Sequence, residues 1–444
     1  MLFIVIPLLL LFLILLSQDL LLGILLTIVA LPSYLIRFSV FGIPTTFLEI
    51  LFLLVVLRWI VYRRKFIFER LTSFRHIPLC LPIFLFLLSA TIGLFIAPDT
   101  RAAFGVFKAY YLEPICFLFI LFDLSRDHHT NLQEKIFRAF GFSAILISIF
   151  GIVQFLFNIG IPIPWDSENR ITSIFEYPNA LALFLEPIIV LSWFQIVKTA
   201  KETKENKKRS RDLWFWILVS TLATINVFLA QSEEGIASLV VTALCILLFS
   251  KITRRQTIVS LLLVGTLVFT IPTSRMYLME KITFQDSSEL VRLSQWKETV
   301  SFLKDHPLFG AGLSGYPILL KPYHQDLQYE IFQYPHNIIL NIWVELGLLG
   351  LVAIFLFAIQ LVRIMIQIRY GTHGYLQEVP LQRFSLTNST THPLFFFVFL
   401  EIFLHGLVDV PYFKNDLAMM TWILLALFIS PYVIPKNLSK KTTA

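Results

Sequence analysis

Apolar runs long enough to cross a lipid bilayer recur along this chain of 444 residues and restrict it to one class of fold. A bilayer core about 30 Å thick needs about 20 apolar residues as helix, because backbone that faces lipid must satisfy its own hydrogen bonds. Hydrophobic residues make up 57% of the chain and charged residues 15%, whereas about a quarter of an ordinary globular protein is charged. The sequence therefore predicts an all-α polytopic membrane protein with about 12 or 13 transmembrane helices.

The candidate spans lie at about residues 2–16, 20–37, 46–62, 77–96, 106–123, 138–157, 179–197, 213–230, 236–250, 257–271, 338–363, 394–410 and 417–434. The first is short and can form a tight hairpin with the second. We divide the chain into an N-terminal transmembrane bundle at 1–271, an extracytoplasmic loop with a surface helix at 272–337, and C-terminal transmembrane helices with a basic cytoplasmic tail at 338–444.

Lysine and arginine gather in short connections, which orients the helices. These connections lie at residues 63–75, 198–211 and 251–255, and the positive-inside tendency places them in the cytoplasm. Alternation of the spans then puts four segments outside: 158–178, 231–235, 272–337 and 409–416. Orientation accounts for the net charge of +7, so we do not expect nucleic acid as a partner.

Motifs that would indicate a cofactor are missing from the sequence. It contains no Walker-type phosphate loop, no His-Glu-x-x-His, no Cys-x-x-Cys and no Asp-x-Asp. Cys80, Cys116 and Cys245 lie inside apolar runs, where cysteine behaves as a small hydrophobic residue. We therefore expect no metal and no cofactor, and an energy source that is either an activated substrate in the membrane or an ion gradient.

The segment from Arg292 to Gly350 begins polar, re-enters an apolar helix, and concentrates the groups that could carry chemistry. The apolar side chains around its start recur at helical spacing: Leu290, Leu293, Trp296, Val300 and Leu303. Because Arg292, Gln295 and Glu298 lie off that stripe, we predict an amphipathic helix along the membrane surface, ended by Pro307.

The glycines at Gly310, Gly312 and Gly315 formally match the dinucleotide motif G-x-G-x-x-G. That motif requires a preceding strand, a following helix and a βαβ unit, and the surrounding sequence predicts none of these. We interpret the glycines as a tight loop beneath the surface helix.

His336 follows Pro335 and precedes an apolar run, so its ring is predicted at the outer mouth of a transmembrane helix. The positive end of that helix disfavours a protonated ring and leaves an imidazole able to accept a proton. A capping or interfacial histidine is the competing interpretation of the same pattern.

Two arginines are candidates for binding a phosphate group. Arg292 lies four residues before Trp296, so the pair could be a cation–π contact at headgroup level, or the guanidinium could hold a diphosphate with its planar donor fork. Arg170 lies on the outer side before a span and could be a second phosphate contact.

Ionisable residues within the predicted spans are costly and tend to mark function. They are Glu49, Glu113, Glu186, Glu345, Glu401 and His405, with Asp409 at the outer end of the span that carries His405. Several could simply pair with one another or with Arg58 and Lys108, and such a set would also suit a transporter.

Several of these segments resemble one family of bacterial membrane proteins. They read R-x-x-x-W from Arg292, HPLFGAGLSGY, PHNIILNIWVELGLLGL, RITSIFEYPNALALFL around Arg170, and HGLVDVPYFKND near the C-terminus. From about residue 40 onward the chain is similar to the O-antigen ligase and polymerase superfamily of membrane glycosyltransferases.

The resemblance implies an enzyme that moves a glycan from an undecaprenyl diphosphate carrier to an acceptor hydroxyl at the outer face of the cytoplasmic membrane, without a metal and with inversion. It implies His336 as general base and Arg292 as the residue that engages the diphosphate. Arg170 is the expected assistant, and Asn337, Asp409 and Trp296 are expected to support these groups. The expected partners are the lipid-linked donor, a lipid, glycan or protein acceptor, and the bilayer itself.

One turn departs from the family pattern. Many members have Ser-Arg-Gly where this chain has Ser232, Glu233, Glu234 and Gly235, and acidic side chains there would repel a diphosphate. Either Arg170 or Arg275 takes over the missing arginine's role, or the donor differs. Two other functions stay open: a secondary transporter of a small anion or solute, and a non-catalytic partner in polysaccharide assembly.

Overall fold

A computed structural model describes the chain at residues 2–40, 43–64, 79–125, 132–205, 209–250, 252–270, 276, 287–325, 329–370 and 391–430. Within these residues the protein is an all-α polytopic membrane protein, as predicted, with one short two-stranded hairpin. Five of the helical segments are long and apolar enough to span a bilayer: Thr100–Ser125, Leu132–Phe157, Pro178–Lys204, Ser210–Leu229 and Ile338–Ile364.

The elements follow the predicted apolar runs in order along the chain. The first half contains α1 (Leu2–Gln18), α2 (Leu20–Val29), η1 (Leu31–Leu35), β1 (Arg37–Val40), β2 (Ile43–Thr46), α3 (Phe47–Arg63), α5 (Cys80–Ile96), α6 (Thr100–Val106), the π-helical segment η2 (Phe107–Leu112), α7 (Glu113–Ser125), α8 (Leu132–Phe157) and α9 (Pro178–Glu205). The second half contains α10 (Ser210–Leu229), α11 (Glu233–Phe249), α12 (Arg254–Thr270), α14 (Ser287–Asp305), α15 (Tyr316–Leu319), η4 (Lys321–Tyr323), α16 (Ile338–Tyr370), α17 (Thr391–Gly406) and α18 (Asn415–Ile429).

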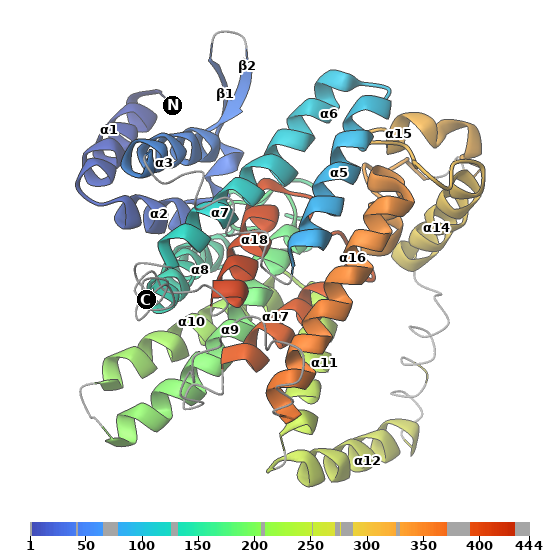
Figure 1. Ribbon diagram of the computed structural model, residues 1–444. Coiled ribbons are helices and arrows are strands. Elements are labelled where there is room, and N and C mark those ends of the chain that lie inside the picture. The colour runs from blue at the N-terminus through green and yellow to red at the C-terminus, as the bar shows by residue number, and fades with distance from the viewer. Residues whose placement is uncertain are drawn as a thin grey trace, which may run out of the picture.

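The bundle is built around α18, which lies in the middle of the molecule (Figure 1). All its residues from Asp416 to Ile429 are buried except Thr421, as expected of a helix that is apolar on every side. It packs against α7, while α9 packs against α10 and α17, and α16 packs against α5. Helices α1 to α3 group at one side, and α12 projects from the bundle next to α11 (Figure 1).

The predicted span at 20–37 is wrong. Asp19 caps α2 and accepts a hydrogen bond from Leu21 N, but α2 ends at Val29 after ten residues. Pro32 then starts the 3₁₀ turn η1, and β1 follows at Arg37. Ten helical residues extend only about 15 Å, which is half a bilayer core. The apolar composition indicated burial correctly, but the proline and the hairpin divide the run.

The glycine-rich loop lies between two helices, as a tight loop and not a nucleotide motif. Ala311 N donates to Val344 O on α16 at 2.6 Å, and Leu313 N donates to Gly93 O on α5 at 3.1 Å. Gly310 has a φ of +67°, and a Cβ there would lie 2.2 Å from Val344 O. The loop can therefore approach both helices only because it lacks side chains at these positions.

The helix predicted around Arg292 is α14, and two of its polar side chains face the protein. Gln295 and Glu298 are buried, and Glu298 accepts a hydrogen bond from Gln325 N at 2.9 Å. Leu290 and Val300, from the predicted apolar stripe, are exposed. Leu303, from the same stripe, is buried together with Phe302. The apolar side chains therefore divide between two sides of α14, and the prediction of an amphipathic helix is wrong. The region boundaries at 271 and 337 remain predictions.

The close approach at Gly310 predicts a large effect of one methyl group. We expect Gly310→Ala to destabilise the protein by about 1–3 kcal/mol, because the added Cβ meets Val344 O and the backbone conformation is strained. The measurement is the melting temperature of the purified protein in detergent. Gly105→Ala is the matched control, since a Cβ there meets nothing within 4 Å, and it should leave the melting temperature unchanged or raise it.

Candidate active site

The predicted site residues gather at one end of the bundle. This end is formed by the start of α9, the end of α10, the starts of α11 and α16, and the segment 407–414 after α17. Three ion pairs mark the opposite ends of α8, α9 and α10: Lys198 to Glu134 at 2.7 Å, Arg138 to Asp212 at 2.9 Å, and Arg209 to Glu202 at 2.7 Å. The starts of α8 and α10 therefore lie together with the end of α9.

His336 forms a hydrogen bond with a buried carboxylate. Its Nδ1 lies 3.2 Å from Asp409 Oδ1, and the two residues are 73 positions apart in the chain. The His336 side chain is 30% exposed and that of Asp409 is 2% exposed, so the imidazole lies between the buried carboxylate and the outside. Phe332 packs edge-on against the ring. This orientation lets Nδ1–H donate to the carboxylate and leaves Nε2 with its lone pair.

Asp409 is held ionised by its surroundings. Burial raises the pKa of its carboxyl, but the hydrogen bond and charge of His336 lower it further, with added effects from His405 and the Val410 N–H. The resulting pKa lies well below the ordinary value, so the carboxylate stays charged at neutral pH. Asn179 Nδ2, at the start of α9, also points to Asp409 Oδ2 at 3.4 Å.

Asn337 fixes the start of α16 directly after His336. Its Oδ1 accepts hydrogen bonds from Ile339 N and Leu340 N, both at 3.0 Å, which is the pattern of a helix N-cap. Its Nδ2 donates to Leu407 O at 2.8 Å, which ties the helix to the segment carrying Asp409. Asn337 therefore positions the imidazole relative to its carboxylate partner.

Trp296 joins α14 to the histidine segment. Its Nε1 donates to Pro335 O at 2.8 Å, and Pro335 immediately precedes His336. Arg292 lies one turn earlier on α14, so the fold brings the predicted arginine and histidine to the same end of the bundle. Arg292 does not stack on Trp296; it forms an ion pair with Glu234 at the start of α11.

Glu234 belongs to the acidic turn that departs from the family pattern, and the sequence predicted no partner for it. Its side chain and that of Arg292 are 18% and 17% exposed, so the pair is largely shielded from water. The acidic turn at Glu234 therefore binds Arg292 through this ion pair. The departure at Glu233 and Glu234 was the feature of the sequence that could have indicated a carboxylate partner for Arg292.

Arg170 also contacts the turn between α10 and α11, but its guanidinium donates hydrogen bonds to backbone carbonyls there. Its Nε donates to Ala230 O at 3.1 Å and its Nη2 to Gln231 O at 3.3 Å. These carbonyls follow the end of α10, where a cation is favourable. The guanidinium also packs on Trp165 at 4.9 Å and lies 3.5 Å from Glu168. Arg275, the other proposed substitute, lies outside the described residues.

Some of the ionisable residues within the spans are paired, whereas Glu113 Oε1 and Glu345 Oε2 are buried without a hydrogen-bond partner among the described residues. Lys108 and Glu49 form an ion pair at 2.6 Å, as anticipated, whereas Arg58 donates to Ser17 O. Glu186 and His405 form a fully buried pair at 2.6 Å, with Glu401 close by.

Comparison with known families finds a match for one part of the chain, 138 of its 444 residues. Residues 218–355 match the family model Wzy_C, which describes O-antigen ligases. This segment is an O-antigen ligase domain. No curated protein matches the chain.

The O-antigen ligase domain contains most of the candidate site but not all of it. It includes Glu234, Arg292, Trp296, His336 and Asn337 and runs from within α10 into α16. Asp409 and Arg170 lie outside it and reach the site only through the fold. The domain supports a glycan-transfer function in a bacterial membrane, with a lipid-linked donor and an acceptor in general terms.

The double role of Asn337 predicts a graded loss of stability. Asn337→Ala should destabilise the protein by about 1–2 kcal/mol, because α16 loses its cap and its tie to Leu407. Asn337→Asp keeps a capping oxygen and loses only the tie, so its melting temperature in detergent should lie between those of the wild type and Asn337→Ala. A melting temperature of Asn337→Ala equal to the wild-type value would exclude the capping role.

Proposed function

We propose that the protein transfers or polymerises a glycan from an undecaprenyl diphosphate carrier onto an acceptor hydroxyl at the outer face of the cytoplasmic membrane. The supporting observation is the His336–Asp409 hydrogen bond, which lies beside α14, the helix that carries Arg292. This arrangement offers a base and a cation at one membrane-proximal end of a bundle that contains an O-antigen ligase domain.

In the proposed reaction His336 acts as the general base. Asp409 accepts Nδ1–H and fixes the tautomer, so that Nε2 takes the proton of the acceptor hydroxyl. The acceptor oxygen forms a bond to the anomeric carbon as the bond from that carbon to the diphosphate oxygen breaks. The electron pair leaves with the diphosphate, and attack from the opposite side inverts the anomeric centre.

Arg292 stabilises the charge that develops on the departing diphosphate. Its planar donor fork suits phosphate oxygens, and the low exposure of the site strengthens the interaction. In this proposal the diphosphate takes the place that the Glu234 carboxylate occupies. Arg170 assists by holding the turn that carries Glu234, and the transfer step uses no metal.

The base assignment predicts a large loss of turnover in one histidine variant. His336→Ala should lower kcat by about 10²–10⁴-fold, the contribution typical of a positioned general base. The measurement is glycan transfer from a lipid-linked donor in membranes that contain the purified variant. His306→Ala is the control, because His306 is an exposed histidine beyond α14 that packs on Phe302.

We expect the control variant to retain wild-type turnover. Near-normal turnover of a well-folded His336→Ala protein would contradict the mechanism and would favour a non-catalytic role in polysaccharide assembly.

The Arg292–Glu234 pair predicts opposite effects of its two members on donor affinity. Arg292→Ala should raise the KM for the lipid-linked donor and lower kcat, because the diphosphate loses its charged partner. Glu234→Gln should lower that KM by about tenfold, because the arginine no longer has a competing carboxylate.

The double variant separates this proposal from a general charge effect. In the Arg292→Ala background, Glu234→Gln should have no further effect on KM, since the competition acts only through the arginine. An equal effect of Glu234→Gln in both backgrounds would show that the two residues act independently, and the diphosphate assignment of Arg292 would then be wrong.

A further inference from the structure

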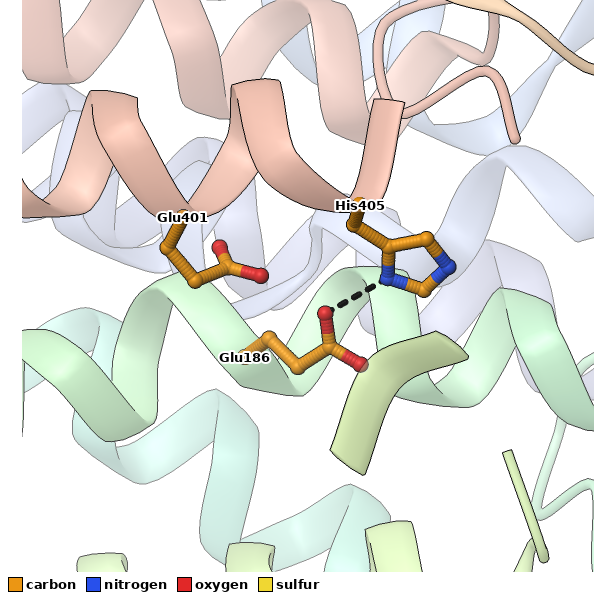
Figure 2. Close-up of side chains that lie close together, drawn as sticks. All are labelled: Glu186, Glu401 and His405. Carbon is orange, nitrogen blue, oxygen red and sulfur yellow. Dashed lines mark hydrogen bonds and ion pairs between the residues drawn. The ribbon is translucent and has the colours of Figure 1, made fainter. Parts of the chain in front are cut away.

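A second cluster of ionisable groups lies inside the bundle, below the candidate active site. Glu401 and His405 project from neighbouring turns of α17 toward Glu186 on α9 (Figure 2). His405 Nδ1 lies 2.6 Å from Glu186 Oε2, and one ligand atom from each of the three residues lies within 4.8 Å of the other two. All three side chains are at most 1% exposed.

Ser238 on α11 closes the cluster from a third helix. Its Oγ lies 3.3 Å from Glu186 Oε2 and 3.3 Å from Glu401 Oε1. Gly235, one turn earlier, is packed so closely on Glu186 that a Cβ there would lie 2.0 Å from Oε1. Three helices therefore converge on two carboxylates, an imidazole and a hydroxyl.

These polar groups satisfy one another only in part. Glu186 Oε1, Glu401 Oε2 and His405 Nε2 have no hydrogen-bond partner among the described residues. Within the same residues, neither carboxylate has an ion pair with lysine or arginine. Each buried carboxyl group therefore keeps one oxygen without a donor, which is costly, and two such groups side by side are more so. The arrangement therefore calls for a positive charge that the described side chains supply only through His405.

We propose that Glu186, Glu401 and His405 bind a divalent transition-metal ion of the zinc class. Two carboxylates and one imidazole form a ligand set typical of such ions, and the Ser238 hydroxyl is placed to complete four-coordination. Zinc ligand atoms in a tetrahedral site lie about 2.0–2.2 Å from the ion and therefore about 3.3–3.6 Å from one another. His405 Nδ1 and Glu186 Oε2, which lie 2.6 Å apart, would therefore separate and give up their hydrogen bond to the ion.

The charge balance supports this assignment. Without a metal the cluster is neutral when Glu186 is ionised, His405 is protonated and Glu401 carries a proton. With a divalent ion it is neutral when both glutamates are ionised and the imidazole is neutral. Binding therefore exchanges one M²⁺ for two protons and leaves the net charge unchanged, which a low-dielectric interior favours.

The bound ion would have a structural role. Its ligands come from α9 and α17, and Ser238 adds α11. The same helices carry the groups of the candidate site: Asn179 begins α9, Glu234 lies four residues before Ser238, and Asp409 lies four residues after His405. A closed site at this depth fixes these three helices without touching the reacting groups, so the proposed transfer chemistry does not depend on it.

The experiment measures metal binding directly on the full-length protein in detergent. The protein is stripped with a chelator, dialysed, and then titrated with Zn²⁺, with Co²⁺ as a spectroscopic probe. We expect one Zn²⁺ per chain, a visible Co²⁺ absorption band typical of a low-symmetry site, and an increase in melting temperature on Zn²⁺ addition. X-ray absorption of the Zn²⁺ form should show nitrogen and oxygen ligands, including one imidazole.

The isosteric variant Glu401→Gln provides the decisive comparison. It should lower the affinity for Zn²⁺ by about 100-fold or more, because an amide cannot replace an anionic ligand. If the cluster instead holds a proton on Glu401, the neutral glutamine should be harmless and Zn²⁺ should not stabilise either protein. Glu113→Gln, at a buried glutamate of α7 outside the cluster, is the matched control and should bind Zn²⁺ like the wild type.

Two results would overturn the proposal: a wild-type protein that binds no stoichiometric Zn²⁺ or Co²⁺, or a Glu401→Gln protein that binds as tightly as the wild type. The wild-type stoichiometry and ligand spectrum decide the question even where a variant fails to fold. Neither result depends on transferase activity, so failure of this proposal is separate from failure of the proposed function.

Discussion

The physical constraint that organises this protein is that ionisable side chains inside an apolar bundle must find their partners within the protein. Asp123 on α7 illustrates it, since it accepts hydrogen bonds from Arg63 and Trp59 on α3 at 2.8 and 3.0 Å. Glu49, near the start of α3, likewise accepts a hydrogen bond from Lys108 Nζ at 2.6 Å. Each pair selects which helices become neighbours, because an unpaired charge at that depth would cost several kcal/mol.

The candidate active site follows the same rule at the edge of the bundle. Asp409 is buried and ionised beneath His336, which is itself partly exposed. Arg292 has a carboxylate partner in Glu234, in the acidic first turn of α11. In the proposed mechanism the donor diphosphate takes the place of the Glu234 carboxylate beside this arginine. Such exchange links donor binding to a change in local charge, with no new residue needed.

The spans were predictable wherever an apolar run was uninterrupted. The runs at 138–157 and 179–197 correspond to α8 and α9, and the all-α class followed from their number. The run at 20–37 misled because apolar composition indicates burial but not helix length, and Pro32 ends the helical geometry. The polar loop at 310–315 was predictable as a loop because its glycines lacked the context of a nucleotide site.

The sequence alone determined the membrane class, the order of the helices, a helix around Arg292, and the candidacy of His336 and Arg292, since these follow from local patterns of polarity and spacing. Only the tertiary structure decided their partners. Asp409 and Glu234 lie 73 and 58 residues away along the chain, and Glu186 lies 219 residues from His405. No local pattern encodes such contacts, because they arise from how whole helices pack, and packing is set by the shape and burial of every face together.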